Sequence, residues 1–354
     1  MAVTAAGPGG AAGAMTVTAA GPGGGAGATA ETETGLAARI RLAVLPTPLV
    51  AAPRLAEALG AGTLYVKRDD LTGFAFAGNK ARPLEFLLAA AIADGADTLV
   101  TGGAPGSNFC AAAAAAAQRA GLRCELVIAG SPSPPGPALA LAMSCGATIR
   151  WTGAPERESV DAGLPRAAAE LAARGQRPYL IPRGGATGLG AVGYALAARE
   201  LHEQLAGHGV DSARVVVAVG SGGTLAGLVA GHVLLGRPWT LVGASVSRPP
   251  EETAGRVLAL ARECLGAIGP PLRRSAEAGD IVVADARGPG HGLPSPEGTA
   301  AAEQAMRTEG LMVDPVYTAK ALALVPRYAE GGNVVFWHTG GGLDTVALAA
   351  EAHR

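Results

Sequence analysis

A glycine-rich loop behind a predicted strand is the most distinctive chemical feature of this sequence. The loop separates an apolar run from a predicted helix and consists of Gly220, Ser221, Gly222, Gly223 and Thr224. Backbone N–H groups of such a loop converge on an anion, and the helix N-terminus adds partial positive charge. No lysine follows and the GxGxxG spacing is absent, which argues against a nucleotide P-loop and a dinucleotide loop. We expect the loop to bind a monophosphate; a tight turn without a ligand is the alternative.

The second feature is a lysine at the start of a predicted helix, in the sequence Gly78-Asn79-Lys80. A cation at this position opposes the helix dipole, so it is a poor choice for stability alone. The chain holds only three lysines among its 28 basic residues, namely Lys67, Lys80 and Lys320. Such a placement is typical of a buried amine with a lowered pKa, as a Schiff-base lysine needs. A solvated surface lysine is the alternative.

Two further loops carry polar groups at the ends of predicted strands. Ser107 and Asn108 open an alanine-rich helix, where they can cap the helix or bind a carboxylate or a phenolate. Thr339 follows the last predicted strand and offers a hydroxyl beside flexible glycine amides. Capping and a C-terminal turn are the ordinary explanations. However, all four features lie where a strand ends, and together they suggest a site for pyridoxal phosphate, which needs a lysine and a phosphate-binding loop.

The elements that must position these groups alternate between strand and helix after residue 42. The strands are predicted at 63–67, 98–101, 124–129, 148–151, 177–181, 215–219, 240–246, 281–284 and 334–337. The helices are predicted at 80–93, 107–120, 137–145, 165–174, 189–205, 223–235, 250–265, 297–310 and 318–328. This alternation predicts a doubly wound α/β protein with two parallel sheets, whose ligands bind at the carboxyl ends of the strands.

The same residues resemble a known family, the D-cysteine desulfhydrase and 1-aminocyclopropane-1-carboxylate deaminase family of fold-type II pyridoxal-phosphate enzymes, which are tryptophan synthase β-like. The resemblance covers roughly residues 43 to 345 in the right order. Its motifs are Pro46–Leu49, Val66–Asp70, Gly78–Lys80, Leu84–Phe86, Gly95–Leu99, Ser107-Asn108, Pro178–Pro182, Gly220–Thr224, Val246–Arg248, Glu309-Gly310, Asp314–Thr318, Lys320-Ala321 and His338–Gly341. The implied architecture is two three-layer α/β/α domains with mostly parallel sheets.

The resemblance implies a role for each matching residue. Lys80 would form the Schiff base with the cofactor and move the Cα proton, with Asn79 in the cofactor-binding set. Gly220 through Thr224 would hold the phosphate, and Asn108 would bond the phenolic oxygen. Ser107 would contact the substrate carboxylate or act near Cα. Thr339 would meet the pyridine nitrogen, where a neutral hydroxyl favours β-elimination over transamination.

Three departures from the family pattern lie in or beside the implied substrate pocket. Gly106 stands where the family usually has Gln, and Phe109 where it often has His or Gln. His291 replaces a family Tyr in His291-Gly-Leu-Pro294, where it could serve as an acid or base near neutrality. A hydrogen-bonded loop histidine is the alternative. The pattern predicts that the cofactor chemistry is kept and that the substrate-contacting set, Ser107, Asn108, Phe109 and His291, has an altered specificity.

The leading hypothesis for the activity is α,β-elimination of D-cysteine, or a related β-substituted amino acid, to a keto acid, ammonia and sulfide. Ring opening of an aminocyclopropane carboxylate and a β-replacement synthase are the rival reactions. A non-catalytic cofactor-binding protein and a sugar-phosphate enzyme that uses the glycine loop alone are rivals from other classes. The family implies a homodimer.

Composition narrows the remaining possibilities. The 28 basic and 29 acidic residues give a formal net charge of −1, which argues against a nucleic-acid binder. No apolar run reaches the ~20 residues of a membrane span, and no signal peptide is recognised, so we expect a cytoplasmic protein. The four cysteines lack metal-site spacing and are expected to be reduced. We expect a disordered tail over 1–35, a large cofactor-binding domain from 36–81 and 184–354, and a small domain over 82–183.

Overall fold

The computed structural model describes residues 15–17, 30–32, 37–269, 274–343 and 345. Its strands are β1 (Met15–Val17), β2 (Ala30–Thr32), β3 (Leu49–Ala51), β4 (Thr63–Arg68), β5 (Thr98–Gly103), β6 (Arg123–Ile128), β7 (Thr148–Trp151), β8 (Pro178–Leu180), β9 (Arg214–Val219), β10 (Thr240–Ser245), β11 (Ile281–Asp285) and β12 (Asn333–His338). Its α-helices are α1 (Pro53–Ala58), α2 (Ala81–Ala93), α3 (Asn108–Arg119), α4 (Pro137–Ser144), α5 (Arg157–Ala173), α6 (Gly188–Gly207), α7 (Gly223–Leu234), α8 (Pro250–Ile268), α9 (Pro296–Glu309) and α10 (Thr318–Leu322).

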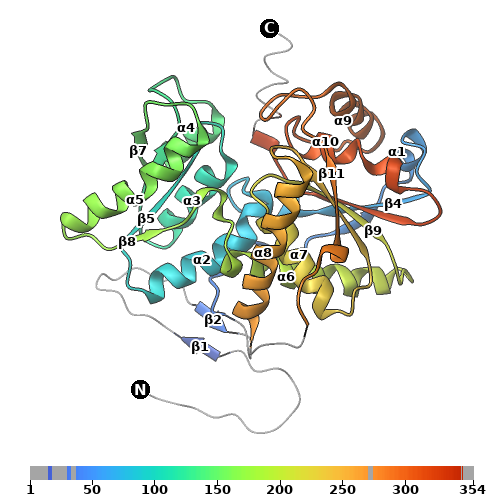
Figure 1. The fold of residues 1–354 in the computed structure, drawn as a ribbon, viewed down its shortest axis with the longest axis horizontal. Helices are drawn as coiled ribbons and strands as arrows, with labels where there is room; N and C mark the ends of the chain where they lie inside the picture. Colours follow the sequence, from blue (N-terminus) through green and yellow to red (C-terminus); the bar gives the residue numbers. More distant parts are fainter. Residues whose placement is uncertain (1–14, 18–29, 33–36, 270–273, 344, 346–354) are drawn as a thin grey trace.

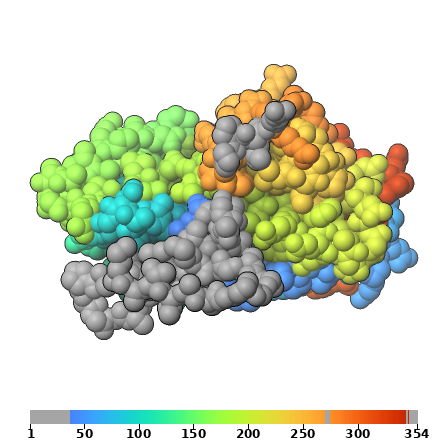
Figure 2. All heavy atoms as spheres, turned by 90° about the horizontal axis from the view of Figure 1, so that it is seen from below, coloured from blue at the N-terminus to red at the C-terminus, as the bar shows by residue number. Residues whose placement is uncertain are grey.

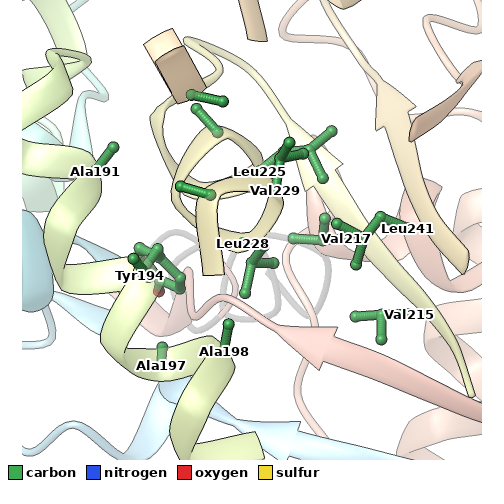
Figure 3. Packing of buried hydrophobic residues seen from close by; sticks show 14 of the residues in the cluster. Ala191, Tyr194, Ala197, Ala198, Val215, Val217, Leu225, Leu228, Val229 and Leu241 are labelled. Atoms are coloured by element: carbon green, nitrogen blue, oxygen red, sulfur yellow. The ribbon is translucent and has the colours of Figure 1, made fainter. Parts of the chain in front are cut away.

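The larger sheet has six strands in the order β11-β10-β9-β12-β4-β3. All neighbouring strands are parallel except the short β3, which pairs antiparallel with β4. Parallel strands carry helices on both faces, so their residues are apolar on both sides. In β9, Val215 and Val217 face α6, α7 and α8, whereas Val216 and Ala218 face the layer of α1, α9 and α10. Figure 3 shows the first of these layers, where Leu225 and Leu228 of α7 lie near the β9 valines.

The smaller sheet is fully parallel, with four strands in the order β7-β6-β5-β8. Successive residues again alternate between the faces. Leu99 and Leu126 pack against α2, α3 and α4, and Val100 and Val127 pack against α5. Figure 1 shows this sheet and its helices as one lobe beside the lobe of the larger sheet, and Figure 2 shows the two lobes from below.

The structure therefore has the two mostly parallel α/β sheets that the sequence predicts. The four-stranded sheet lies inside the predicted small domain of 82–183, although α2 packs on both α3 and α6; the exact domain bounds stay a prediction. Of the predicted tail over 1–35, the structure describes β1 and β2, which pair antiparallel, and the rest lies outside the described residues. None of the described helices combines the length and apolar composition that a bilayer crossing requires.

Candidate active site

One cavity of about 700 Å³ lies where the strand ends of the two sheets face each other, and the loops after β5, β9, β10 and β12 contribute to its wall. It brings together every predicted site residue except one. The lining residues from that prediction are Asn79, Lys80, Ser107, Asn108, Phe109, Gly220, Ser221, Gly222, Thr224, His291 and Thr339. Gly223 lines a much smaller neighbouring cavity behind the same loop. Residues up to 260 positions apart in sequence thus share one space.

Lys80 is held at the cavity wall by a tight backbone arrangement. A 3-10 turn over Gly78–Lys80 leads directly into α2. Gly78 has φ +53°, and a Cβ atom there would lie 2.4 Å from the carbonyl oxygen of Thr339, so only glycine fits. The amine of Lys80 has no hydrogen-bond or ion-pair partner among the described residues. Burial lowers its pKa from 10.5 to about 8, and the carboxylate of Asp314 opposes this shift only in part.

Asn79 connects three of the strand-end loops. Its backbone N–H donates to the carbonyl oxygen of Thr339 at 2.8 Å, and its side-chain amide donates to Oγ1 of Thr224 at 3.0 Å. The residue is buried, so these two bonds form in a low-dielectric environment. Asn79 therefore fixes Lys80 relative to the glycine loop and the loop after β12, and its place in the cofactor-binding set stays a prediction.

The glycine loop takes the strand-to-helix path that the sequence predicts. It follows β9, and Gly222, with φ +100°, caps α7. Two arginine side chains support the loop: Arg248 donates to the carbonyl oxygen of Gly220 at 2.9 Å, and Arg256 donates to that of Ser221 at 2.7 Å. These bonds occupy the loop's carbonyl groups, which leaves its N–H groups free to face an anion. The added guanidinium charge makes the loop still better suited to a phosphate.

Ser107 and Asn108 begin α3 at the end of β5. Ser107 is the N-cap, and its Oγ accepts a hydrogen bond from the N–H of Cys110 at 3.3 Å. The capping explanation therefore holds, while the hydroxyl proton of Ser107 stays available to the cavity. Asn108 differs, because its Oδ1 is buried without any hydrogen-bond partner in the described part of the chain. A buried polar atom without a partner is costly, so Asn108 Oδ1 indicates a place where a ligand binds.

His291 lies in the loop between β11 and α9, and Lys320 holds this loop in place. The ammonium group of Lys320 donates to the carbonyl oxygens of Arg287 and Gly290, at 2.7 and 3.1 Å. His291 Nε2 lies 3.5 Å from the hydroxyl of Tyr317, and the two rings meet edge to face. Burial, followed by the nearby cations, lowers the pKa of His291, so the neutral imidazole predominates near pH 7.

Several cavity residues were absent from the predicted site. Tyr317 and Asp314 occur in a motif that the resemblance includes, but the motif itself assigns them no chemistry. Arg183 gave no signal, because a lone arginine after a predicted strand looks like an ordinary surface residue. A positional signal exists only for Arg157, a cation at the first residue of a helix, where it opposes the dipole as Lys80 does.

The residues present fit pyridoxal phosphate. The amine without a partner suits a Schiff base, and the glycine loop backed by arginines suits the phosphate. The orphaned Asn108 amide and the Thr339 hydroxyl offer polar groups for the ring on two sides of the cavity. The site thus supplies each group that this cofactor requires from its protein.

Comparison with known proteins gives an independent identification. A D-cysteine desulfhydrase of Klebsiella pneumoniae (strain 342) is 39% identical over 316 residues, which cover 86% of this chain and 94% of that protein. A D-cysteine desulfhydrase of Salmonella choleraesuis (strain SC-B67) matches with the same identity and coverage. The crystal structure of an ACC deaminase homologue superimposes with a TM-score of 0.76 at 32% identity, covering 88% of this chain and 96% of the other.

Maize serine racemase, at 18% identity and a TM-score of 0.62, shares the fold. Residues 40–340 match the family described as pyridoxal-phosphate dependent enzyme. These matches confirm the predicted family, fold class and cofactor. The chain belongs to the pyridoxal-phosphate dependent enzymes and is related to the D-cysteine desulfhydrases.

Proposed function

We propose that this chain catalyses α,β-elimination on a small α-amino acid, with D-cysteine as the reference substrate and pyruvate, ammonium and sulfide as products. The observation that carries the proposal is the amine of Lys80, which has no partner among the described residues and lines the same cavity as the glycine loop and the Asn108 amide. The names of the relatives at 39% identity support the choice of D-cysteine. When bound, the cofactor would hold the substrate amine and withdraw electrons from Cα.

Lys80 is the group that moves the proton of Cα. Because burial lowers its pKa to about 8, a useful fraction of the amine is neutral near pH 7 and can accept a proton. The carboxylate of Asp314 stabilises the resulting ammonium, so the charge that forms during proton transfer has a fixed counter-charge. The hydrogen bonds of Asn79 hold this lysine in one place while the proton moves.

Ser107, Thr339 and His291 have supporting roles in the proposal. The Ser107 hydroxyl and the first N–H groups of α3 would bind the substrate carboxylate, because a helix N-terminus favours an anion. Thr339 offers a neutral hydroxyl to the cofactor ring, which keeps the ring less electron-withdrawing than a carboxylate partner would. The neutral His291, paired with Tyr317, can exchange a proton with the departing β-substituent.

The test uses the chain loaded with cofactor. We expect sulfide and pyruvate from D-cysteine in equal amounts, and no product from the Lys80→Ala variant. After borohydride reduction, mass spectrometry should find the cofactor mass on the peptide that contains residue 80 and nowhere else. A protein that binds the cofactor through another residue would contradict the role of Lys80. A protein labelled at Lys80 that releases neither sulfide nor keto acid would contradict the elimination.

Ring opening of 1-aminocyclopropane-1-carboxylate is the second candidate, favoured by the ACC deaminase homologue structure at a TM-score of 0.76. It differs from the elimination in its product, 2-oxobutyrate, which is separable from pyruvate by chromatography. A β-replacement synthase is recognised by loss of O-acetylserine in the presence of sulfide without keto acid formation. The same loaded protein can be assayed with all three substrates, so one of the reactions will dominate.

A further inference from the structure

Three arginines line the cavity near His291. Arg157 is the first residue of α5, Arg183 lies in a 3-10 turn after β8, and Arg248 follows β10. Asp314 is the one carboxylate among the lining residues, counted over the described part of the chain. Its oxygens already accept hydrogen bonds from a threonine hydroxyl and three backbone N–H groups. The lining therefore carries an excess of positive charge.

The acidic partners of these arginines lie on the solvent side. The arginine side chains are 32, 26 and 12% exposed in chain order, whereas the carboxylates paired with them are 77, 50 and 59% exposed. These carboxylates belong to Glu158, Asp161 and Glu252, none of which lines the cavity. Since solvent screens exposed charges more strongly than half-buried ones, the acids neutralise the outer surface better than the cavity.

The three arginines have different amounts of hydrogen-bonding capacity left. Arg248 supports the glycine loop through its bond to Gly220, so the phosphate group accounts for its charge. Arg183 is bound by both oxygens of Asp161, at 3.0 and 2.8 Å. Arg157 donates no hydrogen bond among the described residues, and its ion pair with Glu158 measures 4.0 Å. A half-buried guanidinium with free N–H groups is a strong binding group for an oxyanion.

The pKa values of His291 and Arg248 indicate the same excess of positive charge in the cavity lining. Burial is the largest cause of the lowered pKa of His291. Four positive charges lower it further, those of Arg157, Lys320, Arg183 and Arg248. The pKa of Arg248 itself is lowered, by burial first and then by Arg157. Positive charges that repel one another in a folded protein are stable when a bound anion compensates them. The cofactor phosphate would lie at the glycine loop, which leaves Arg157 without a hydrogen-bonded anion in the described part of the chain, whereas Arg183 is paired with Asp161 on its solvent side.

We propose that the preferred substrate is an α-amino acid whose β-substituent is an oxyanion, a sulfonate or a phosphate, bound by Arg157 and Arg183. The inference rests on the proposed elimination and changes only the leaving group. The thiol of D-cysteine has no oxygen that could accept a hydrogen bond from a guanidinium, whereas a sulfonate or a phosphate has several. It also gives a reason for the departures at Gly106, Phe109 and His291, since a bulkier, charged substituent needs a different pocket. Cysteate and O-phosphoserine are the simplest members of this class.

The elimination balances for such a substrate. The proton of Cα passes to Lys80, its bonding electrons form the Cα–Cβ double bond, and the pair of the Cβ–S bond leaves with sulfite. The enamine takes up a proton at Cβ, and water releases the nitrogen. Cysteate and water therefore give pyruvate, ammonium and hydrogensulfite, without any oxidant or reductant. With O-phosphoserine the Cβ–O bond breaks instead, and hydrogenphosphate leaves.

The test compares charged and uncharged leaving groups on the loaded protein. Pyruvate formation is measured with both enantiomers of cysteate and O-phosphoserine, with D-cysteine, and with β-chloroalanine, whose leaving group is uncharged in the substrate. We expect the highest kcat/KM with an oxyanion substrate. In Arg157→Gln and Arg183→Gln, that kcat/KM should fall at least tenfold, mostly through KM, because each variant loses a charge-assisted hydrogen bond to the substrate. Arg157→Lys should recover part of it.

The controls separate a binding role from a folding defect. Turnover of β-chloroalanine should stay within about twofold in all three variants, because it does not use the arginines. Arg166→Gln, which removes an exposed arginine from the same helix α5, should change nothing. Binding is also measured without turnover: calorimetry with 3-sulfopropanoate, which lacks the reacting amine, should show affinity in the parent chain and a loss in Arg157→Gln.

Two results would overturn the inference. One contradicts only the oxyanion site, and the other contradicts the proposed elimination as well. If β-chloroalanine and D-cysteine react but cysteate and O-phosphoserine react no faster, or are unaffected by Arg157→Gln, the oxyanion site is wrong while the proposed elimination stands. If the loaded protein forms no pyruvate from any of these amino acids, the proposed elimination falls and the inference falls with it. Separate results for sulfonate and phosphate decide between the two oxyanions.

Discussion

At the scale of single residues, the site depends on polar groups that the fold buries and leaves without partners. Lys80 and Asn108 are the two clearest cases, one with a free amine and the other with an orphaned amide oxygen. Both cost free energy in the chain without a bound ligand, since burial of an unpaired polar group is unfavourable. A bound cofactor recovers that cost, so these residues link folding free energy to ligand binding.

The lowered pKa of Lys80 predicts its reactivity in the chain without cofactor. The neutral, nucleophilic fraction of an amine rises with pH and reaches one half at the pKa, which burial brings to about 8. Acetylation of Lys80, followed by mass spectrometry over a pH series, should therefore show a midpoint near pH 8. Asp314→Asn should move the midpoint lower, because the carboxylate favours the ammonium form. A midpoint near the ordinary 10.5 would show that the amine is solvated.

Ser107 has a structural and a proposed chemical role, and two substitutions separate them. Ser107→Ala removes the N-cap of α3 and should lower the free energy of unfolding by ~1 kcal/mol. Ser107→Asp keeps a capping oxygen but replaces the hydroxyl by a carboxylate that repels the substrate carboxylate. We expect near-parental stability in urea and strongly reduced turnover for this variant. Full turnover in Ser107→Asp would limit Ser107 to its capping role.

At the scale of elements, a buried polar network fixes the first turn of α2, which follows Lys80. Both oxygens of Asp69 accept hydrogen bonds from Arg82, at 3.0 and 2.9 Å. They also accept bonds from Thr47, Tyr194 and Trp337, at 2.7, 2.6 and 2.9 Å. These partners come from four different parts of the chain: the segment before β3, α2, α6 and β12. The network therefore ties α2 to β12 and α6, and it sets the position from which Lys80 enters the cavity.

Asp69 should make stability depend on acid pH. Burial alone would raise its pKa, but Arg82 and the hydrogen bonds outweigh burial and lower it to about 2. A carboxyl with a depressed pKa contributes stability that is present above its unfolded pKa near 3.8 and is lost as the pH falls through about 2. The contribution is ~2 kcal/mol.

Urea unfolding at pH 7, 4 and 2.5 measures this contribution. Asp69→Asn should cost ~3–5 kcal/mol at pH 7, because it leaves the Arg82 charge with less compensation. Its stability should then vary less than that of the parent chain between pH 4 and 2.5. Equal pH dependence in the two chains would exclude Asp69 as the responsible group.

The contact between α6 and α7 depends on glycine in a way that helix propensity would not suggest. A Cβ atom at Gly227 would lie 2.2 Å from the carbonyl oxygen of Ala191 and 2.4 Å from Cβ of Tyr194. Gly227→Ala should therefore destabilise the protein by ~1–3 kcal/mol or more despite the better propensity of alanine. Gly255→Ala in α8 is the matched control, because nothing lies within 4 Å of its added Cβ, and it should stabilise by ~0.5–1 kcal/mol. Thermal unfolding of both variants provides the comparison.

The sequence predicts the ends of helices and strands well where turn-forming residues determine them. It predicts them poorly where packing against the rest of the protein determines them. The helix predicted at 165–174 begins at Arg157, because Val160 and Leu164 extend its apolar stripe onto the smaller sheet and Pro165 is accommodated inside the helix. The helix predicted at 318–328 ends at Leu322 and is followed by a 3-10 turn that contains Pro326. A single sequence does not show which proline ends a helix and which is accommodated inside one by tertiary packing.

At the scale of the whole molecule, the cavity lies between two lobes, and the groups proposed for the cofactor come from both. Asn108 belongs to the smaller lobe, whereas Ser221 and Thr339 belong to the larger one (Figure 1). A ligand held by both lobes binds the folded arrangement and not the unfolded chain. Its binding therefore adds stability in proportion to its concentration relative to Kd.

Removal of the cofactor should lower the melting temperature of this chain. At a hundredfold excess over Kd, reconstitution should add ~2.7 kcal/mol to the free energy of unfolding. Asn108→Ala and Ser221→Ala, one from each lobe, should both reduce this gain without lowering the stability of the cofactor-free chain by more than ~1 kcal/mol. Differential scanning calorimetry at several cofactor concentrations measures both effects. A concentration-independent melting temperature would show that neither lobe contributes to binding.

The sequence by itself determined the alternation of strands and helices, the glycine loop, the place of Lys80 at a helix start and the family, because these depend on local spacing and on contiguous motifs. Only the tertiary structure decided which side chains share the cavity with Lys80. Arg157 begins a helix and Arg183 directly follows the Pro178–Pro182 motif, so neither belongs to a motif, and they line the same cavity because parallel strands end at a common edge. The same holds for burial: the lowered pKa of Lys80 and the orphaned amide of Asn108 are properties of the surroundings, which residue type and spacing do not specify.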